Sequence, residues 1–344
     1  MVVGDSLRRR LGRRLQGLSW PALVFAPAVA VLAALPLLLL QPAQAQGNAP
    51  LKLVVPFAPG GAQDVIGRYL ADKLGPRLGT TVVVENRAGA GGAIAADAVA
   101  KAAPDGHTLL LATGGAITIA PHLNPKLAYD PKRDFTAVAL VADTPMTLAV
   151  RAQSPYRTLA DMLRDAKARP GEVAYASTGN GTISHLTGEL LAQAAGVKLL
   201  HVPYKGAAPA ITDLLGGQVP LLVTSSASID PMVEDGKARV LVTFTASRLA
   251  NLKSPPTVAE AGYTGLEVPV WVGVLAPAKT PVARLEQLAG EIAQICRLPE
   301  TRERFAGLGA LVTCGGPRRT RARRQRRLPA LGPRHQGRRH QARR

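Results

Sequence analysis

The sequence is poor in the residues that fasten small secreted folds or hold metals. It has only two cysteines, Cys296 and Cys314, which are too few for a disulfide framework, and a single bridge between them stays open. It contains no His-Glu-x-x-His, no Cys and His at metal-ligand spacing and no Gly-x-Ser-x-Gly. We therefore predict no metal, no cofactor and no catalytic residues.

Residues 317–344 lack every acidic, lysine and aromatic residue but contain twelve arginines. Their one β-branched residue is Thr320, so this tail cannot bury a core of its own. We predict that it is disordered or the product of a shifted reading frame near residues 313–317, and we favour the frameshift. A tail that binds nucleic acid or an anionic membrane is the alternative, because dense arginine binds phosphate.

Apart from its two arginine-rich ends, the chain is almost neutral. It has 42 Lys and Arg against 23 Asp and Glu, but residues 46–316 hold 25 of these basic residues and 22 of the acidic ones. The high overall charge therefore does not belong to the part that folds. We predict no nucleic-acid partner for it.

Residues 1–45 resemble a secretory signal peptide. Five arginines precede an apolar run over residues 20–40, and Ala43-Gln44-Ala45 closes the segment. A retained membrane anchor is the alternative, but three prolines interrupt the apolar run. We predict export with cleavage before Gln46, by either the general or the twin-arginine route.

Between residues 46 and 316, short apolar strands alternate with helices. This order predicts mainly parallel sheets with helices on both faces. The expected strands are 51–56, 81–85, 108–113, 173–177, 199–203 and 221–224, and the expected helices are 64–78, 93–103, 159–168, 184–196, 208–216 and 281–296.

The same alternation predicts an α/β fold of two doubly wound domains. Crossings at 147–151 and 268–277 would join a discontinuous first domain, 46–147 and 270–316, to a second domain, 148–269. Hinged domains of this kind enclose a small ligand in the cleft between them.

Two loops in this pattern are suited to an anion. Phe57–Ala62 and Ser177–Thr182 each follow a strand and lead a helix, so helix N-termini from both domains can face one anion. The plainer interpretation is that the glycines serve turns and the hydroxyls cap helices. The glycine-rich stretch 86–92 departs from the dinucleotide fingerprint, so we assign it to shaping the edge of the sheet.

Five motifs, in order, resemble those of the Bug family, the periplasmic substrate-binding receptors of tripartite tricarboxylate transporters. They are Pro56-Phe-Ala-Pro-Gly-Gly-x-x-Asp64, Glu85-Asn-Arg-x-Gly-Ala-Gly-Gly92, Pro104-Asp-Gly-His-Thr108, Ser177-Thr-Gly-Asn-Gly-Thr-x-Ser-His-Leu186 and His201-Val-Pro-Tyr-Lys-Gly206.

The resemblance implies a monomeric type II periplasmic binding protein that closes on a small carboxylate, held largely by main-chain donors and ordered water. Its partner would be the membrane part of a transporter, or a signalling sensor. For His185 we favour a structural role over ligand binding; Tyr204 and Lys205 are open between the two. The predicted ligand-binding residues are Phe57, Ala58, Pro59, Gly60, Gly61, Asp64, Thr113, Gly114, Ser177, Thr178, Gly179, Gly181, Thr182, His185, Tyr204, Lys205, Thr224 and Ser225.

Two departures from the family pattern carry expectations of their own. Relatives often have an acidic residue where Thr224 stands, which favours a di- or tricarboxylate or an aromatic acid over an amino acid. After Gly309 the family continues with a helical tail on the first domain, so the arginine run is expected to leave apolar surface uncovered. An exported hydrolase and a nucleic-acid binder remain as other classes.

Overall fold

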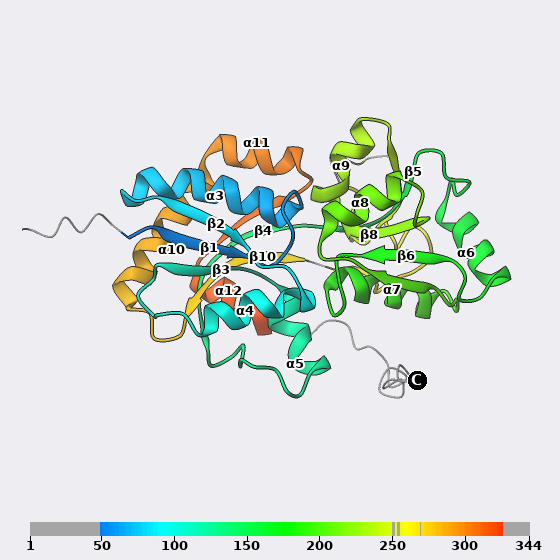
Figure 1. Ribbon diagram of the computed structural model, residues 1–344. Helices are drawn as coiled ribbons and strands as arrows, with labels where there is room; N and C mark the ends of the chain where they lie inside the picture. The colour runs from blue at the N-terminus through cyan, green and yellow to red at the C-terminus, as the bar shows by residue number, and fades with distance from the viewer. Residues whose placement is uncertain (1–48, 250–251, 253–254, 269, 326–344) are drawn as a thin grey trace, which may run out of the picture. The chain divides into compact units, whose positions relative to one another are not determined.

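The computed structural model describes residues 49–249, 252, 255–268 and 270–325. The predicted signal peptide and residues 326–344 of the arginine-rich tail lie outside the described residues. Within the described ranges, no helix has both the length and the apolar character needed to cross a membrane. Two β-sheets with helices on their faces make up this part of the chain (Figure 1).

The first sheet has six strands, which are β1 (Leu51–Val55), β2 (Val82–Asn86), β3 (Thr108–Thr113), β4 (Phe135–Asp143), β10 (Trp271–Pro277) and β11 (Leu311–Gly315). Their order is β11-β4-β10-β3-β1-β2. β1 pairs in parallel with β2 and β3, whereas β10 lies antiparallel between β3 and β4, and β11 is antiparallel to β4.

Helices cover both faces of the first sheet because strand side chains alternate between the faces. Leu51, Leu53 and Val55 join one core with α3, α10 and α11, and Val54 joins another with α4 and η2. We call this sheet and its helices the first lobe. Its helices are α3 (Ala62–Leu78), η1 (Ala90–Gly92), α4 (Ala93–Ala100), η2 (Gly115–Ile119), α5 (Ala120–Leu123), α10 (Val282–Arg297), α11 (Pro299–Gly307) and α12 (Pro317–Gln325).

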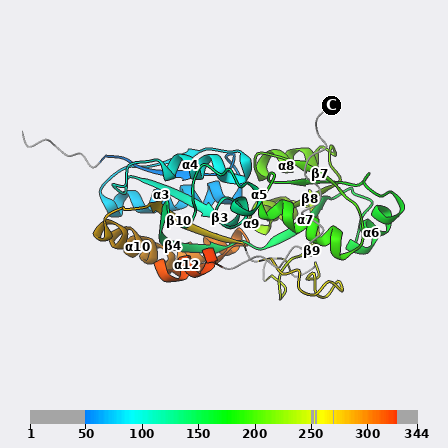
Figure 2. The same cartoon turned by 90° about the horizontal axis from the view of Figure 1, so that it is seen from below.

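Residues 317–325, for which we predicted disorder or a shifted reading frame, form helix α12 and are not disordered. It lies beside β4 in the view from below (Figure 2). Thr320, the only β-branched residue of the tail, is fully buried, and a Cβ on Gly273 of β10 would lie 3.4 Å from its methyl group. Thr320 therefore packs beside Gly273, and β11 and α12 cover the surface that we expected to be bare.

The second sheet has five strands, which are β5 (Met146–Arg151), β6 (Ala174–Ser177), β7 (Leu200–Pro203), β8 (Leu221–Ser225) and β9 (Ala238–Thr243). Their order is β7-β6-β8-β5-β9, with β6 parallel to β7 and β8, and β5 antiparallel to β8 and β9. This sheet and its helices form the second lobe.

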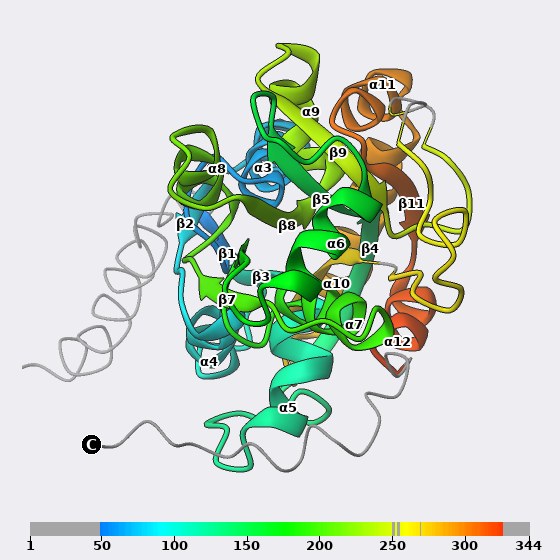
Figure 3. The same cartoon turned by 90° about the vertical axis from the view of Figure 1, so that its right-hand side faces the viewer.

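Four helices flank the second sheet, and these are α6 (Leu159–Ala168), α7 (Ile183–Ala194), α8 (Ala207–Leu215) and α9 (Ser226–Glu234). α6 and α7 share a core with Leu148 and Val223, and α8 and α9 share the opposite core with Ala149 and Leu222. Figure 3 shows the two pairs on either side of β8. Helix α6 begins at a capping box between Thr158 and Asp161.

The prediction of mainly parallel sheets is wrong. Each sheet is mixed, because the strands that carry the chain between the lobes enter antiparallel to their neighbours. β4 ends at Asp143 in the first sheet and β5 begins at Met146 in the second, while β9 of the second sheet precedes β10 of the first. The chain therefore passes between the two sheets twice.

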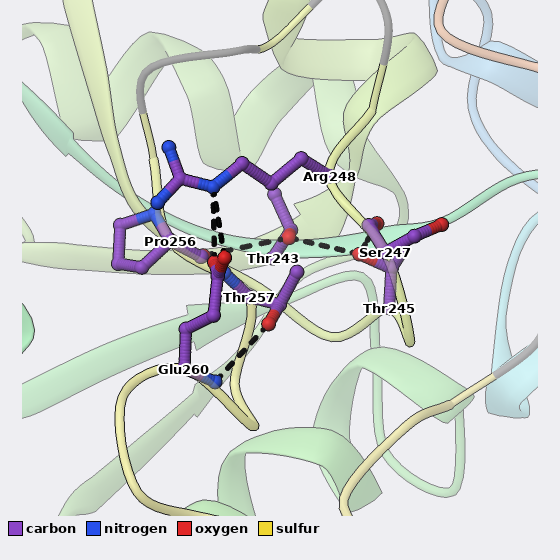
Figure 4. Close-up of polar contacts among 7 residues, drawn as sticks. All are labelled: Thr243, Thr245, Ser247, Arg248, Pro256, Thr257 and Glu260. Atoms are coloured by element: carbon purple, nitrogen blue, oxygen red, sulfur yellow. Dashed lines mark hydrogen bonds and ion pairs between the residues drawn. The ribbon is translucent and has the colours of Figure 1, made fainter.

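The segment that follows β9 toward the first lobe is fastened by a polar network (Figure 4). Thr257 N–H donates to Glu260 Oε2 (2.8 Å), and Glu260 N–H donates to Thr257 Oγ1 (3.1 Å). Arg248 Nε donates to both Glu260 oxygens at 3.0 Å. Thr243 Oγ1 lies 2.9 Å from Thr245 Oγ1. The bond from Thr257 N–H, and after it those from Arg248, lower the pKa of Glu260 below its usual value.

Candidate ligand-binding site

A small cavity of about 30 Å³ lies where the predicted loops of the two lobes meet. Phe57 follows β1, Thr113 ends β3, Thr178 follows β6 and Thr224 lies near the end of β8. All four strands present their carboxyl ends here, which is where α/β sheets bind ligands. The lining residues are Phe57, Gln63, Thr113, Met146, Thr178, Thr182, Ile183, Ser184, Thr224, Ser225, Ser228 and Val270.

The described residues that line the cavity include no charged side chain. Seven are serines or threonines, one is Gln63, and Phe57, Met146, Ile183 and Val270 supply apolar surface. Hydroxyl groups can donate hydrogen bonds to an anion without the desolvation cost of a buried cation. The lining therefore suits a small ligand with polar ends and an apolar middle.

Helix N-termini add positive potential to this lining. Thr182 is the N-cap of α7, and its Oγ1 accepts from His185 N–H at 3.3 Å. Ser225 is the N-cap of α9, and Gln63 lies in the first turn of α3. Because the N-terminal end of a helix carries a partial positive charge, the three helices favour a negative group in the cavity.

One lining hydroxyl is buried without a partner. Thr224 is fully buried, and its Oγ1 makes no hydrogen bond within the part of the chain that the structure describes. A buried hydroxyl left unpaired costs about 1–3 kcal/mol, so such groups usually meet a ligand or water. Thr224 Oγ1 is thus a donor that a cavity ligand can use.

The loop of the first lobe is organised by a buried carboxylate. Asp64 accepts hydrogen bonds from Gly60 N–H (3.0 Å), Arg68 Nε (3.0 Å) and Asn86 Nδ2 (2.9 Å). Burial alone would raise the pKa of Asp64, but these bonds, led by that of Arg68, lower it below its usual value. Asp64 therefore supports the predicted binding loop and does not line the cavity.

The loop of the second lobe is organised by neutral groups. Ser177 Oγ lies 2.6 Å from His201 Nε2 and accepts from Gly179 N–H at 3.1 Å. Gly181 N–H donates to His185 Nδ1 at 3.2 Å, and Thr182 Oγ1 donates to Gly179 O at 2.7 Å. Hydroxyls and imidazoles thus hold the glycine-rich turn in place.

Two stacked imidazoles contact this loop. The rings of His185 and His201 are 3.9 Å apart and nearly parallel, and the Tyr175 ring lies 5.0 Å from His201. Burial, with a smaller contribution from His185, lowers the pKa of His201 to about 4. Tyr175 Oη donates to Glu189 Oε1 at 2.8 Å. His185 is thus bonded to the loop through Gly181 N–H and does not line the cavity.

Of the residues predicted to bind the ligand, six line the cavity. The other predicted positions surround it, and many of their backbone N–H groups donate within the protein. Ala58 N–H, for example, donates across the lobes to Lys205 O at 3.1 Å, and Gly179 N–H donates to Ser177 Oγ at 3.1 Å. The lining positions are Phe57, Thr113, Thr178, Thr182, Thr224 and Ser225, and those outside the lining are Ala58, Pro59, Gly60, Gly61, Asp64, Gly114, Ser177, Gly179, Gly181, His185, Tyr204 and Lys205.

Tyr204 does not line the cavity. Its Oη donates to Asp213 Oδ2 at 2.5 Å, and burial together with that bond raises the pKa of Tyr204 to about 12. Lys205 meets the first lobe through its carbonyl oxygen.

Six lining residues were not in the predicted set. Ser184 is part of the fourth quoted motif and Gln63 is a variable position of the first, and both stand in the first turns of helices, so the expected helix starts could have pointed to them. Met146 and Val270 lie at the two crossings, which no local pattern marks. The lining residues outside the prediction are Gln63, Met146, Ile183, Ser184, Ser228 and Val270.

The two lobes touch beside the cavity. Ala62 N–H of α3 donates to Ser228 Oγ of α9 at 3.2 Å. Gly91 approaches the second-lobe loop so closely that a Cβ on it would lie 2.6 Å from Asn180 O. Contacts of this kind belong to a closed arrangement of the lobes, and a ligand larger than the cavity needs the lobes to part.

A larger cavity of about 440 Å³ lies elsewhere, between α6 and the segment after β9. It is lined by Leu159, Arg164 and Tyr263, among others. It contains none of the loops at the carboxyl ends of the parallel strands, so its size alone does not make it the ligand site.

Two α/β lobes with a double chain crossing, and a closed hydroxyl-lined cavity at the ends of their strands, define a two-lobed solute-binding protein. The chain belongs to the tripartite tricarboxylate transporter receptor family, whose family model matches residues 66–315. The matched region ends where the arginine-rich tail begins. Proteins of this family are periplasmic substrate-binding proteins and not enzymes.

Curated relatives extend over most of the chain. A protein from the tcbD-tcbE intergenic region of Pseudomonas sp. strain P51 is 41% identical over 269 residues, which cover 78% of this chain and 80% of the relative. Protein BugT of Bordetella pertussis is 37% identical over 273 residues, covering 79% of this chain and 84% of BugT. The resemblance to the Bug family is thereby confirmed.

Solved structures are similar over the same span. The periplasmic binding protein BugD is 38% identical with a TM-score of 0.77, covering 80% of this chain and 93% of BugD. R. palustris Rpa4515, solved with adipate, is 34% identical with a TM-score of 0.78 and coverage of 81% and 93%. MatC from Rhodopseudomonas palustris, solved with malate, is 34% identical with a TM-score of 0.74 and coverage of 77% and 90%.

Proposed function

We propose that this protein captures a small dicarboxylate in the cavity between its lobes. The observation that carries the proposal is Thr224 Oγ1, a buried and unpartnered hydroxyl in a lining that has no described charged residue. The similar structures with adipate and malate support the same ligand class. Tricarboxylates and aromatic acids are the alternative ligand classes.

The chemistry of the cavity favours a plain carboxylate over an amino acid. A buried ammonium group is best paired by a carboxylate, and the described lining has none. The carboxylates of the ligand would take hydroxyl donors and the helix N-termini of α3, α7 and α9, while Met146 and Val270 would pack on its apolar middle. Selective binding of aspartate or glutamate would contradict this assignment.

The first experiment is calorimetric titration of the full chain with malate, adipate, succinate and aspartate. A dicarboxylate is expected to bind and aspartate is not. Thr224→Val keeps the side-chain shape but removes the hydroxyl, so it should weaken dicarboxylate binding about tenfold. Equal affinity in the wild type and the variant would remove Thr224 from the site.

Thr144→Val is the matched control for that substitution. Thr144 is also fully buried with an unpartnered Oγ1 among the described residues, but it does not line the cavity. It should leave the affinity unchanged. A parallel loss in both variants would show that the effect is structural.

We further propose that the protein is a monomer in the periplasm and delivers its ligand to the membrane components of a tripartite tricarboxylate transporter. The division into a discontinuous first domain, 46–147 and 270–316, and a second domain, 148–269, belongs to the same proposal. Uptake of the labelled ligand by cells with and without the gene tests the partner: unchanged uptake would favour a signalling sensor. Light scattering tests the monomer.

A further inference from the structure

The two cysteines lie on different elements of the first lobe but pack in the same core. Cys296 stands in the last turn of α10 and is fully buried, while Cys314 of β11 is partly buried against the same core. The elements that carry them, α10 and β11, contact each other, so the two thiols are neighbours in this core. Burial raises the pKa of Cys296 to about 12, and the neighbouring Cys314 thiol adds to the rise.

The backbone around Cys314 is irregular in a way that serves this contact. Between the pairs Val312–Ala142 and Gly315–Leu140, two residues of β11 stand opposite one residue of β4. Cys314 itself has φ of +41°, in a region that residues with a Cβ rarely adopt. Such bulges re-aim a side chain, and here Cys314 packs against the core that contains Cys296.

We propose that Cys296 and Cys314 form a redox pair that closes to a disulfide and fastens β11 to α10. The sequence holds only these two cysteines, so neither has another partner in the chain. Disulfides form and persist in oxidising compartments such as the periplasm, where an oxidant that carries a disulfide can act on two neighbouring thiols. The proposal is independent of which ligand the cavity binds.

The reaction proceeds by thiol–disulfide exchange with such an oxidant. The more accessible Cys314 thiol loses its proton to water, and its thiolate attacks the oxidant disulfide, forming a mixed disulfide and releasing one oxidant thiolate. Cys296, once deprotonated, attacks the Cys314 sulfur and expels the second oxidant thiolate. Two protein thiols are oxidised by two electrons, and one oxidant disulfide is reduced to two thiols.

The closed loop fastens a segment that matters to both lobes. It contains α11 and Gly309, whose carbonyl accepts a hydrogen bond from Ser226 Oγ of the second lobe at 2.9 Å. The edge strand β11 and the helix α12 follow directly. A disulfide would therefore tie the C-terminal edge of the sheet to its core.

The test uses the purified full chain, treated under native conditions with oxidised glutathione or with dithiothreitol. After trypsin, the peptides Leu285–Arg297 and Phe305–Arg318 should be joined in the oxidised sample, with the loss of two hydrogens. A glutathione adduct on Cys314 should precede the bridge, because Cys296 is the more buried thiol. Two free thiols after native oxidation would overturn the proposal.

Thermal unfolding supplies a second readout. Closing a loop of this length should raise the melting temperature of the oxidised protein by about 5–10 °C over the reduced one. Cys314→Ser, at a partly exposed position, and Cys296→Ala should each abolish that difference while the protein still unfolds cooperatively. The same redox-dependent shift in Cys314→Ser would contradict the pair.

Discussion

Two loops have the same place in their lobes but are held by different chemistry. Phe57–Gly61 follows β1 and leads into α3, and Ser177–Thr182 follows β6 and leads into α7. The first is organised by the carboxylate of Asp64, the second by hydroxyls and two imidazoles. The same topology is therefore compatible with different stabilising groups in a binding loop. The two loops should lose their structure under different conditions.

Removing the carboxylate of the first loop should have the largest effect on stability. Asp64→Ala leaves Gly60 N–H, Asn86 and Arg68 without their acceptor, and we expect a loss of about 3–4 kcal/mol in the free energy of unfolding. Asp64→Asn keeps one acceptor oxygen and should lose about half as much. Urea unfolding at pH 7 measures both, and a loss below about 1 kcal/mol in the Ala variant would contradict this role.

Acid should loosen the second loop before the first. The folded-state pKa of His201 is about 4, below the value of about 6.5 in an unfolded chain, so its stabilisation is complete above pH 6.5 and is lost as the pH falls to 4. The loss amounts to at most about 3 kcal/mol. Asp64, whose pKa is lowered from 3.8, releases its contribution only below that pH.

The groups around His201 define the control for the acid experiment. His185 stacks on it, Tyr175 lies beside it, and Glu189 accepts from Tyr175. Unfolding measured from pH 7 to pH 4 should show a steep fall for the wild type. His201→Gln cannot take up the proton, so its curve should be flatter, and equal slopes would assign the titration to another group.

The contact between the lobes can be broken at Gly91. A Cβ there would lie 2.6 Å from Asn180 O of the second loop, so Gly91→Ala should hinder closure and weaken ligand binding by about 2 kcal/mol, or about 30-fold. Gly236→Ala is the matched control, because Gly236 has φ of +68° against +63° for Gly91 and open space around it. Calorimetric titration should find the control unchanged in affinity.

The fold could be predicted where local chemistry decides the structure. The strand at 108–113 and the helix at 159–168 were predicted with the observed bounds. In the structure, the helix begins at a capping box at Thr158. β4 was missed, because its buried run of alanine, valine and leucine has no period that separates strand from helix. The antiparallel entry of β5 and β10 depends on pairing between distant strands, which no local motif encodes.

The candidate site was likewise predictable only where local motifs place its residues. Residues in the quoted motifs, such as Phe57 and Thr182, could be placed at the cavity because their loops follow predicted strands. Asp64 belongs to a motif too, yet its carboxylate accepts a hydrogen bond from the loop and does not line the cavity. Met146 and Val270 come to the lining through the crossings, and the unpaired state of Thr224 Oγ1 is a property of packing that a sequence does not display.

The smallest expected effect concerns how each helix begins at the site. Thr182 Oγ1 caps α7 by accepting from His185 N–H, whereas α3 begins at Gly61 without a side-chain cap among the described residues. Thr182→Ala should therefore lose about 1 kcal/mol of unfolding free energy, and Thr182→Ser should retain it. Gly61→Ala adds a Cβ at an ordinary 3.6 Å from Ala207 Cβ and should lose less than about 0.5 kcal/mol. Urea unfolding compares the three variants. Equal losses at Thr182 and Gly61 would mean that packing determines where both helices begin. The second loop would then not depend on its hydroxyls.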